Sequence, residues 1–291
     1  MKRIQKLFFM MIMVSVLIGC NAEKESNEEK KVEEKDWAIN HIVINKDHKQ
    51  GKRKVKIAIL DSGISKINEL KDSIIYSYNT IDGSEVTNDV YGHGTMVASL
   101  IASQSTKFEN ISLNPHVEIL DIQVLNDKGQ GNIESVVEGI NKAIEKNVDI
   151  INLSIGFSND SIKLKEVVDK AMAKGINVVA STGNTLGYST DYPAKYNGVI
   201  SVSAIDKENS IYIHAGKGKV DVVAPGVDIP VINGKSQLDY QSGTSFATAY
   251  VSGIISLYLE DGESIDRNFL KNKSTELGNS KTYGIGLLTY N

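Results

Sequence analysis

Short apolar runs and longer amphipathic stretches alternate along the chain from Trp37 onward. The apolar runs are rich in Val and Ile, which favour β-strands, and the amphipathic stretches have the spacing of helices with one buried face. Parallel strands joined by right-handed helical crossovers produce this alternation. The pattern predicts strands over 55–60, 117–125, 148–155, 177–181, 198–205 and 220–225, and helices over 93–104, 132–147, 161–175, 245–260 and, briefly, 264–272.

The predicted elements place the chain in the α/β class. Its 291 residues, 41% of them hydrophobic, can bury a substantial core as one large domain or as two small ones. No internal repeat is visible. In a parallel sheet, functional residues collect where strands end at their carboxyl edge and helices begin. Residues that carry chemistry are therefore expected at those positions.

The N-terminal segment reads as a targeting signal. Lys2, Arg3 and Lys6 precede an apolar run over 7–18 that is short for a membrane span. The run ends in "LIGC" at 17–20, which resembles the bacterial lipobox, so Cys20 is expected to carry a lipid. An ordinary buried cysteine is the alternative.

These features divide the chain into three parts. We expect a lipoprotein signal peptide over 1–19, a lipid-anchored charged linker over 20–36 and a folded domain over 37–291. The linker has too little apolar surface to fold alone, although a solvated helix is an alternative there. The expected location is extracytoplasmic, at the bacterial cell membrane.

Charge and cysteine content exclude several classes of function. A net charge of −4 argues against a nucleic-acid partner, and the basic stretch at 51–56 reads as a solvated lead-in to a strand. Cys20 is the single cysteine, so no internal disulfide can form. A cysteine peptidase is disfavoured because that residue belongs to the lipobox, and no H-E-x-x-H motif of a zinc peptidase occurs.

Three motifs at predicted element ends carry candidate chemistry. Asp61 opens "DSG" after a strand, His93 lies in "GHGT" at a helix start, and Ser245 lies in "GTSFATAYVSG" at another helix start. Each has an ordinary structural explanation as a turn, a helix start or an N-cap. Together they supply a complete acyl-transfer set: Ser245 as nucleophile, His93 as general base, and Asp61 to orient and stabilise the imidazole. We also expect Gly92 and Gly94 to leave clearance for a substrate backbone.

These three motifs, in the order Asp, His, Ser, resemble the subtilisin family of serine peptidases over residues 37–291. The resemblance implies a three-layer, doubly wound, mostly parallel sheet with helices on both faces. It also implies a serine endopeptidase that acts on polypeptides through an acyl-enzyme and requires no cofactor. Asn184 in "ASTGNTLG" matches the family's oxyanion-hole asparagine, with the backbone N–H of Ser245 as second donor.

The resemblance further implies where a substrate binds. In this family the peptide is added as an extended strand to exposed edges, a form of β-augmentation. The matching segments here contain Ser154, Ile155 and Gly156, and Gly129, Gln130 and Gly131. Asp191 aligns with the base of the pocket for the residue before the cut, where a carboxylate would favour Lys or Arg; the alternative is that it faces solvent.

Some positions depart from the family pattern. Met96 stands where a second histidine is common, and Ala249 and Tyr250 replace Pro-His, without touching the triad. No recognisable calcium loop follows the histidine helix, so calcium cannot be assumed. The carboxylates that could bind a cation are instead expected to be scattered surface acids: Glu69, Asp82 and Asp89.

The sequence thus predicts a membrane-anchored, monomeric serine endopeptidase. The short spacing from Cys20 to Trp37 leaves no room for a folded pro-domain, which suggests processing of secreted peptides, such as bacteriocin leaders. A catalytically silent, lipid-anchored peptide-binding protein on the same fold is the alternative. An α/β-hydrolase esterase is disfavoured, because the stretch "GTSFA" lacks the final glycine of G-x-S-x-G.

Overall fold

A computed structural model describes residues 37–44, 51, 53–108 and 110–291. The expected signal peptide over 1–19, Cys20 and the expected linker over 20–36 lie outside the described residues. Residues Ala38–Asn291 form one compact unit. Its main sheet has the strand order β10-β11-β7-β6-β5-β4-β1-β3-β2, and all neighbours are parallel except β10 and β11.

The core strands follow from runs of apolar residues that are buried on both faces, as expected for a parallel sheet covered by helices. β4 and β6 are buried at every position, and β1 at every position but its first. The sequence pattern located these strands correctly to within a few residues. The strands in this set are β1 (Lys56–Asp61), β3 (Glu118–Gln123), β4 (Ile150–Leu153), β5 (Asn177–Ser181), β6 (Ile200–Ile205) and β7 (Val222–Pro225).

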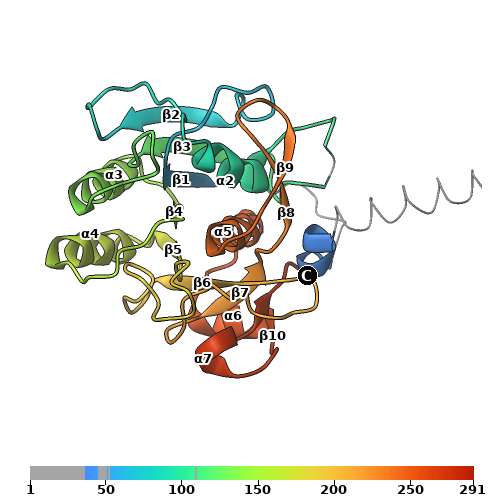
Figure 1. The fold of residues 1–291 in the computed structure, drawn as a ribbon. Coiled ribbons are helices and arrows are strands. Elements are labelled where there is room, and N and C mark those ends of the chain that lie inside the picture. The colour runs from blue at the N-terminus through green and yellow to red at the C-terminus, as the bar shows by residue number, and fades with distance from the viewer. Residues whose placement is uncertain (1–36, 45–50, 52, 109) are drawn as a thin grey trace, which may run out of the picture. The chain divides into compact units, whose positions relative to one another are not determined.

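Helices cover both faces of the sheet (Figure 1). On one face, α3 (Ile133–Glu145) packs on β1 and β3, and α4 (Ile162–Ala173) packs on β5. On the other face, α5 (Thr244–Glu260) lies across β4 to β7 and contacts α2 (His93–Ala102). The predicted three-layer α/β fold is therefore confirmed. Helix α5 is buried along its whole length, which its small Ala, Ser and Gly residues make possible.

Several elements escaped the hydrophobic pattern. β2 (Ile74–Asn79) is an edge strand whose side chains are mostly half-buried, and its sequence IIYSYN shows no clear apolar run. β8 (Ile229–Ile232) and β9 (Leu238–Gln241) form a separate antiparallel hairpin. Among the short elements at the end of the chain, the helix α6 (Arg267–Asn272) was expected, whereas β10 (Ser274–Thr275), α7 (Ser280–Tyr283) and β11 (Leu287–Leu288) were not.

Candidate active site

The candidate site lies where three adjacent strands end. β5, β4 and β1 are neighbours in the sheet, and Asp61 is the last residue of β1. His93 is the first residue of α2, and Ser245 is the second residue of α5. Because α2 and α5 pack together on one face of the sheet, their N-termini deliver both side chains to the same carboxyl edge.

The Asp61 carboxylate faces the ring of His93. Its two oxygens lie 2.8 and 2.9 Å from Nδ1 of the ring, and only 1% of Asp61 is exposed. The backbone N–H of Ser62 donates a further hydrogen bond of 2.8 Å to Oδ1 of Asp61. This arrangement favours the tautomer with the proton on Nδ1, which leaves Nε2 able to accept a proton.

A second buried carboxylate, Asp89, holds the start of α2. It accepts hydrogen bonds from the backbone N–H groups of Gly92 at 2.7 Å and Thr95 at 2.8 Å, and from the Thr95 hydroxyl. The hydroxyl of Ser62 donates to it at 2.7 Å and lies 3.3 Å from Oδ1 of Asp61. Gly92 has no side chain with which to cap α2. Asp89 therefore accepts hydrogen bonds from the N–H groups that have no partner within the helix, and so fixes the backbone of His93.

The surroundings of His93 raise its pKa above the ordinary value. Burial acts most strongly and lowers the pKa, but the charge and hydrogen bond of Asp61, together with the charge of Asp89, outweigh it. Its side chain is 18% exposed, so the ring is reachable from the cleft. A histidine held in this way can take a proton from a nearby hydroxyl and stabilise the resulting positive charge.

Ser245 makes no hydrogen bond to His93 in the described part of the chain, although the residue that follows it contacts the His93 ring. Its hydroxyl donates to the carbonyl oxygen of Ser154 at 3.2 Å, and the ring of the next residue, Phe246, is centred 5.7 Å from the His93 ring. Hydrogen bonds between nucleophile and base are often long or poorly aligned until substrate binds. For His93 to accept its proton, the Ser245 hydroxyl must give up its hydrogen bond to Ser154.

Asn184 places an amide beside the start of α5. Its Oδ1 accepts hydrogen bonds from the backbone N–H and the hydroxyl of Thr244, both at 3.2 Å. This contact fixes the orientation of the amide, because the N–H of Thr244 can only donate. The amide nitrogen lies near the residue before α5, because a Cβ atom built on Gly243 would be 3.2 Å from Nδ2 of Asn184.

A buried chain of polar side chains ties α5 to β4. The hydroxyl of Ser252 donates to Oδ1 of Asn152 at 2.9 Å, and Nδ2 of Asn152 donates to the hydroxyl of Ser154 at 3.0 Å. The Ser154 hydroxyl in turn donates to the carbonyl oxygen of Ser245 at 3.2 Å. These bonds fix the first turn of α5 relative to the end of β4.

A cleft of about 230 Å³ opens next to His93. Its walls include five of the residues expected at the substrate-binding edges: Ser154, Ile155, Gly156, Gly129 and Gly131. The structure places the sixth, Gln130, differently. It closes a turn with Asn126, through bonds of 2.9 Å and 3.1 Å, and is not among the residues that line the cleft.

Asp191 lies between two glycines of the site. A Cβ atom built on Gly156 would lie 2.7 Å from Cβ and 2.9 Å from Oδ2 of Asp191, and one built on Gly183 would collide with the same Oδ2. The carboxylate therefore fills the space between an expected substrate edge and the loop of Asn184. Burial raises the pKa of Asp191, and the cation of Lys195 opposes that effect.

Two sequence-based interpretations were wrong. Gly94 is buried, and a Cβ there would collide with the carbonyl oxygen of Gly63, so this glycine permits packing between α2 and the segment after β1 and gives no substrate clearance. Asp89 is a buried hydrogen-bonding residue rather than a surface acid.

The other two carboxylates considered as cation ligands form ordinary hydrogen bonds. Glu69 accepts one from the hydroxyl of Ser236, and Asp82 accepts one from the backbone N–H of Ser84. Within the described part of the chain, no three His, Cys, Asp or Glu side chains gather to hold a metal ion.

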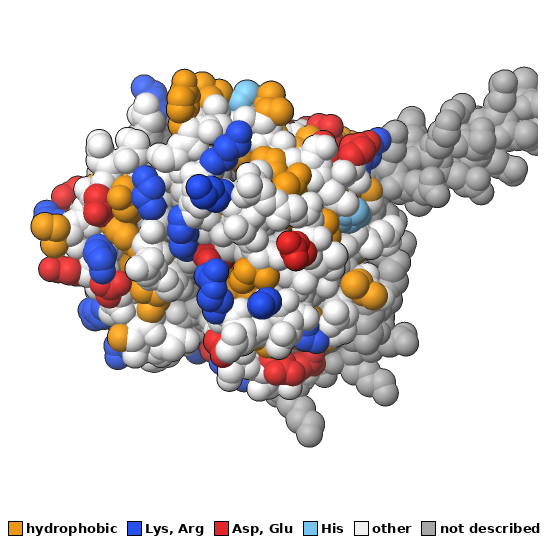
Figure 2. Space-filling view, turned by 90° about the horizontal axis from the view of Figure 1, so that it is seen from below, with side chains coloured by type: hydrophobic (Ala, Val, Ile, Leu, Met, Phe, Trp, Pro, Cys, Tyr) orange, Lys and Arg blue, Asp and Glu red, His pale blue; other side chains and the backbone are white. Residues whose placement is uncertain are grey.

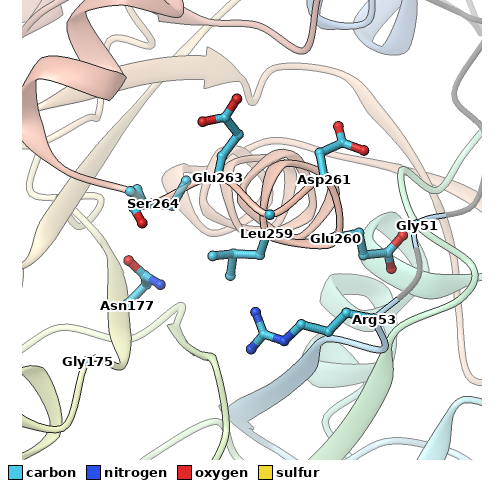
Figure 3. Close-up of a pocket in the computed structure, with 11 residues that line it drawn as sticks. Gly51, Arg53, Gly175, Asn177, Leu259, Glu260, Asp261, Glu263 and Ser264 are labelled. Carbon is cyan, nitrogen blue, oxygen red and sulfur yellow. The ribbon is translucent and has the colours of Figure 1, made fainter.

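A larger cavity of about 920 Å³ lies at the other end of α5 (Figure 3). It is lined by residues from the end of that helix, including Leu259 and Asp261, with Arg53 across from them. A helix of 17 residues spans about 25 Å, so this cavity is remote from Ser245. None of the candidate site residues lines it.

Sequence reasoning missed several residues around the site. The contacts of Asp89, the link through Ser62 and the ring of Tyr91 in the cleft depend on segments that meet only in the fold. The position of Asp89 shortly before the start of α2 could have indicated that it caps this helix.

On the face that Figure 2 shows, basic and acidic side chains are interspersed with apolar and uncharged ones.

Comparison with known proteins agrees with this geometry. Residues 52–286 match the model of the subtilase family. The chain is 34% identical over 260 residues to Subtilisin Savinase of Lederbergia lenta. The aligned region covers 87% of this chain and 96% of the relative. The chain is equally similar over 260 residues to M-protease of Shouchella clausii (strain KSM-K16), with 87% of this chain and 68% of the relative covered.

The chain belongs to the subtilase family. It is accordingly a serine endopeptidase with the three-layer α/β fold of that family, it acts on polypeptides, and its catalysis requires no cofactor. This assignment favours the enzyme over a silent binding protein. No helix in the described part of the chain is long and apolar enough to cross a membrane.

Proposed function

We propose that this protein is a membrane-anchored, extracytoplasmic endopeptidase that cleaves secreted peptides after Lys or Arg. Ser245 attacks the scissile carbonyl while His93 accepts its proton, and Asp61 stabilises the imidazolium that forms. The oxyanion is bound by Nδ2 of Asn184 and the backbone N–H of Ser245. The contact of both Asp61 oxygens with Nδ1 of His93, beside the start of α5, carries this assignment.

The preference for a basic residue rests on the position of Asp191. The substrate strand lies between the edges 129–131 and 154–156, with its scissile carbon at Ser245. The side chain before the cut then enters the space beside Gly156, where the Asp191 carboxylate lies. A Lys or Arg there would gain a charge-assisted hydrogen bond in a partly buried setting, whereas an acidic side chain would be repelled.

Peptides that differ only at the residue before the cut test this preference. With the full chain, kcat/KM for Lys and Arg should exceed that for Gln and Leu by tenfold or more. Asp191→Asn keeps the shape of the side chain, removes its charge and should abolish the difference. Equal cleavage of basic and neutral peptides by the natural chain would contradict the role of Asp191, and Ser245→Ala serves as the inactive control.

The anchor and the cellular role rest on the N-terminal sequence. We propose a signal peptide over 1–19, a diacylglyceryl group on Cys20 and a linker over 20–36 that spaces a monomeric domain from the membrane. Narrow basic specificity beside a membrane suits removal of leaders from secreted peptides, such as bacteriocin precursors. Cys20→Ala should release the protein into the medium, and retention of this variant in the membrane fraction would argue against the anchor.

A further inference from the structure

Three large apolar side chains are exposed on two loops next to the active site. Leu186 and Tyr188 follow Asn184 in the loop after β5, and Ile213 lies in the loop between β6 and β7. These three side chains, which we call the apolar tip, are 68%, 76% and 76% exposed. A single exposed apolar residue is ordinary in a folded protein, whereas a group of them marks an interaction surface.

Backbone contacts hold the two loops of the apolar tip side by side. The N–H of Lys217 donates to the carbonyl oxygen of Tyr188 at 2.7 Å. The N–H of Gly187 donates to the carbonyl oxygen of His214 at 3.4 Å. A Cβ atom built on Gly187 would lie 3.5 Å from the carbonyl oxygen of Ile213 and 3.5 Å from Nζ of Lys217. The apolar tip is therefore one surface feature, with an ammonium group beside it.

The backbone of Leu186 is unusual for an apolar residue. The N–H of Tyr188 donates to the carbonyl oxygen of Thr185 at 3.1 Å and closes a turn. The two central residues of this turn, Leu186 and Gly187, have φ values of 56° and 78°. Turns with positive φ at both central positions favour Asn, Asp and Gly, because other side chains are strained there. Burial does not offset this strain, since Leu186 is mostly exposed, and uncompensated strain is typical of functional sites.

The charges next to the apolar tip are positive. Lys217 is exposed, and so is Lys281, whose carbonyl oxygen accepts a hydrogen bond of 3.2 Å from the N–H of Gly218. Neither ammonium group forms a salt bridge with a described residue. Glu208, an acid in the same loop as Ile213, lies 4.0 Å from Nζ of its neighbour Lys207. Two unpaired cations therefore accompany the apolar tip.

This charge distinguishes the apolar tip from other exposed apolar side chains of the chain. Ile81 and Val86, in the segment after β2, are 52% and 63% exposed. Their exposed charged neighbours are the acids Asp82 and Glu85. An anionic partner would be attracted to the apolar tip and repelled from the segment after β2.

We propose that the apolar tip inserts into the surface of an anionic membrane, with Lys217 and Lys281 against the lipid headgroups. Apolar side chains suit the acyl region, Tyr suits the boundary with water, and basic side chains bind anionic headgroups. Because Leu186 is two residues from Asn184, docking in this way brings the active-site edge of the sheet close to the membrane. Peptides at the membrane surface are then within reach. This inference rests on the proposed location at a membrane, but not on the lipid at Cys20.

The fluorescence of a label at the apolar tip tests the inference in the full chain. Cys20 and Ser245 are replaced by alanine, so that no lipid is attached and no self-digestion occurs. A polarity-sensitive fluorophore is then attached through Leu186→Cys, which supplies the single cysteine. Vesicles of phosphatidylglycerol and phosphatidylcholine should move its emission to shorter wavelengths. Vesicles of phosphatidylcholine alone should cause little change, because they lack the charge that attracts Lys217.

Matched variants separate the apolar tip from other contacts with the vesicles. Val86→Cys, labelled in the same way, is exposed next to Glu85 and should show no shift. Lys217→Gln should raise the lipid concentration for the half-maximal shift at Leu186 about fivefold, the contribution of one lysine near an anionic surface. Lys71→Gln removes the same charge shortly before β2, at the opposite edge of the sheet, and should leave that concentration unchanged.

Several outcomes would overturn the inference. These are no shift at Leu186, equal shifts at Leu186 and Val86, or the same shift at Leu186 with neutral vesicles. A shift that appears without vesicles and grows with protein concentration would also overturn it, because a second copy of the chain would then cover the apolar tip. The lipid anchor is tested separately, since Cys20 is absent from every chain in this experiment.

Discussion

The buried carboxylate of Asp121 should make the protein less stable as the pH rises. Asp121 lies in the middle of β3 and is 1% exposed. Its Oδ2 accepts hydrogen bonds from the Thr87 hydroxyl and, at 3.2 Å, from the backbone N–H of Ile64. Its buried Oδ1 has no donor among the described residues. An ionised carboxylate in this position is unfavourable, because one of its two oxygens is buried without a hydrogen-bond donor.

Burial raises the pKa of Asp121 to about 7, from an ordinary value of 3.8. The hydrogen bonds from Thr87 and Ile64 oppose the rise, and the charges of Asp89 and Asp61 add to it. Between pH 3.8 and about 7, the unfolded chain releases this proton and the folded chain keeps it, so stability falls as the pH rises. At about 1.4 kcal/mol for each pH unit of that interval, the loss amounts to about 4 kcal/mol at pH 8.

The Asp121→Asn variant removes this titration and keeps the shape of the side chain. Unfolding free energies from urea titration should be compared at pH 4 and pH 8, in the Ser245→Ala background to prevent self-digestion. The stability of the variant relative to its parent should increase by about 4 kcal/mol between the two pH values. Asp82→Asn, at an exposed position, is the control and should show no such increase. Equal differences at both pH values would refute the reasoning.

Three further variants test the site. Asn184→Ala should lower kcat by about 10²- to 10³-fold with little change in KM, because the lost donor acts on the transition state. Asp89→Asn should move the acid limb of kcat/KM to lower pH, because one of the charges that raise the pKa of His93 is removed; Asp82→Asn should leave that limb in place. Gly94→Ala should lower the free energy of unfolding by roughly 1–3 kcal/mol in urea titration, because its methyl group meets the carbonyl oxygen of Gly63.

The sequence allowed the fold to be predicted where one signal dominated. Strands such as β4 and β6 are buried on both faces, so short stretches dominated by Val, Ile, Leu and Ala identified them despite a few polar residues. β2 is an edge strand whose side chains are mostly half-buried, so its sequence mixes apolar and polar residues and shows no apolar run. The hairpin of β8 and β9 joins segments that are too short to show a period of their own.

The site could be predicted only as far as local motifs reach. Asp61 and His93 lie in short motifs at element ends, and the structure brings them into contact. The capping of α2 by Asp89 and the contact of Tyr91 with Gly129 arise between segments separated in the chain. The packing role of Gly94 could not be predicted for the same reason: Gly94 lies in α2, and the Gly63 carbonyl that it meets follows β1.

A serine-directed sulfonyl fluoride tests most directly that Ser245 is the nucleophile activated by His93. Peptide mass spectrometry of the inactivated full chain should find one modification, on Ser245, in proportion to the lost activity. Ser245→Ala should remain unmodified, and His93→Ala should react far more slowly. Stoichiometric labelling of another residue, or equal labelling of the natural chain and Ser245→Ala, would contradict the assignment.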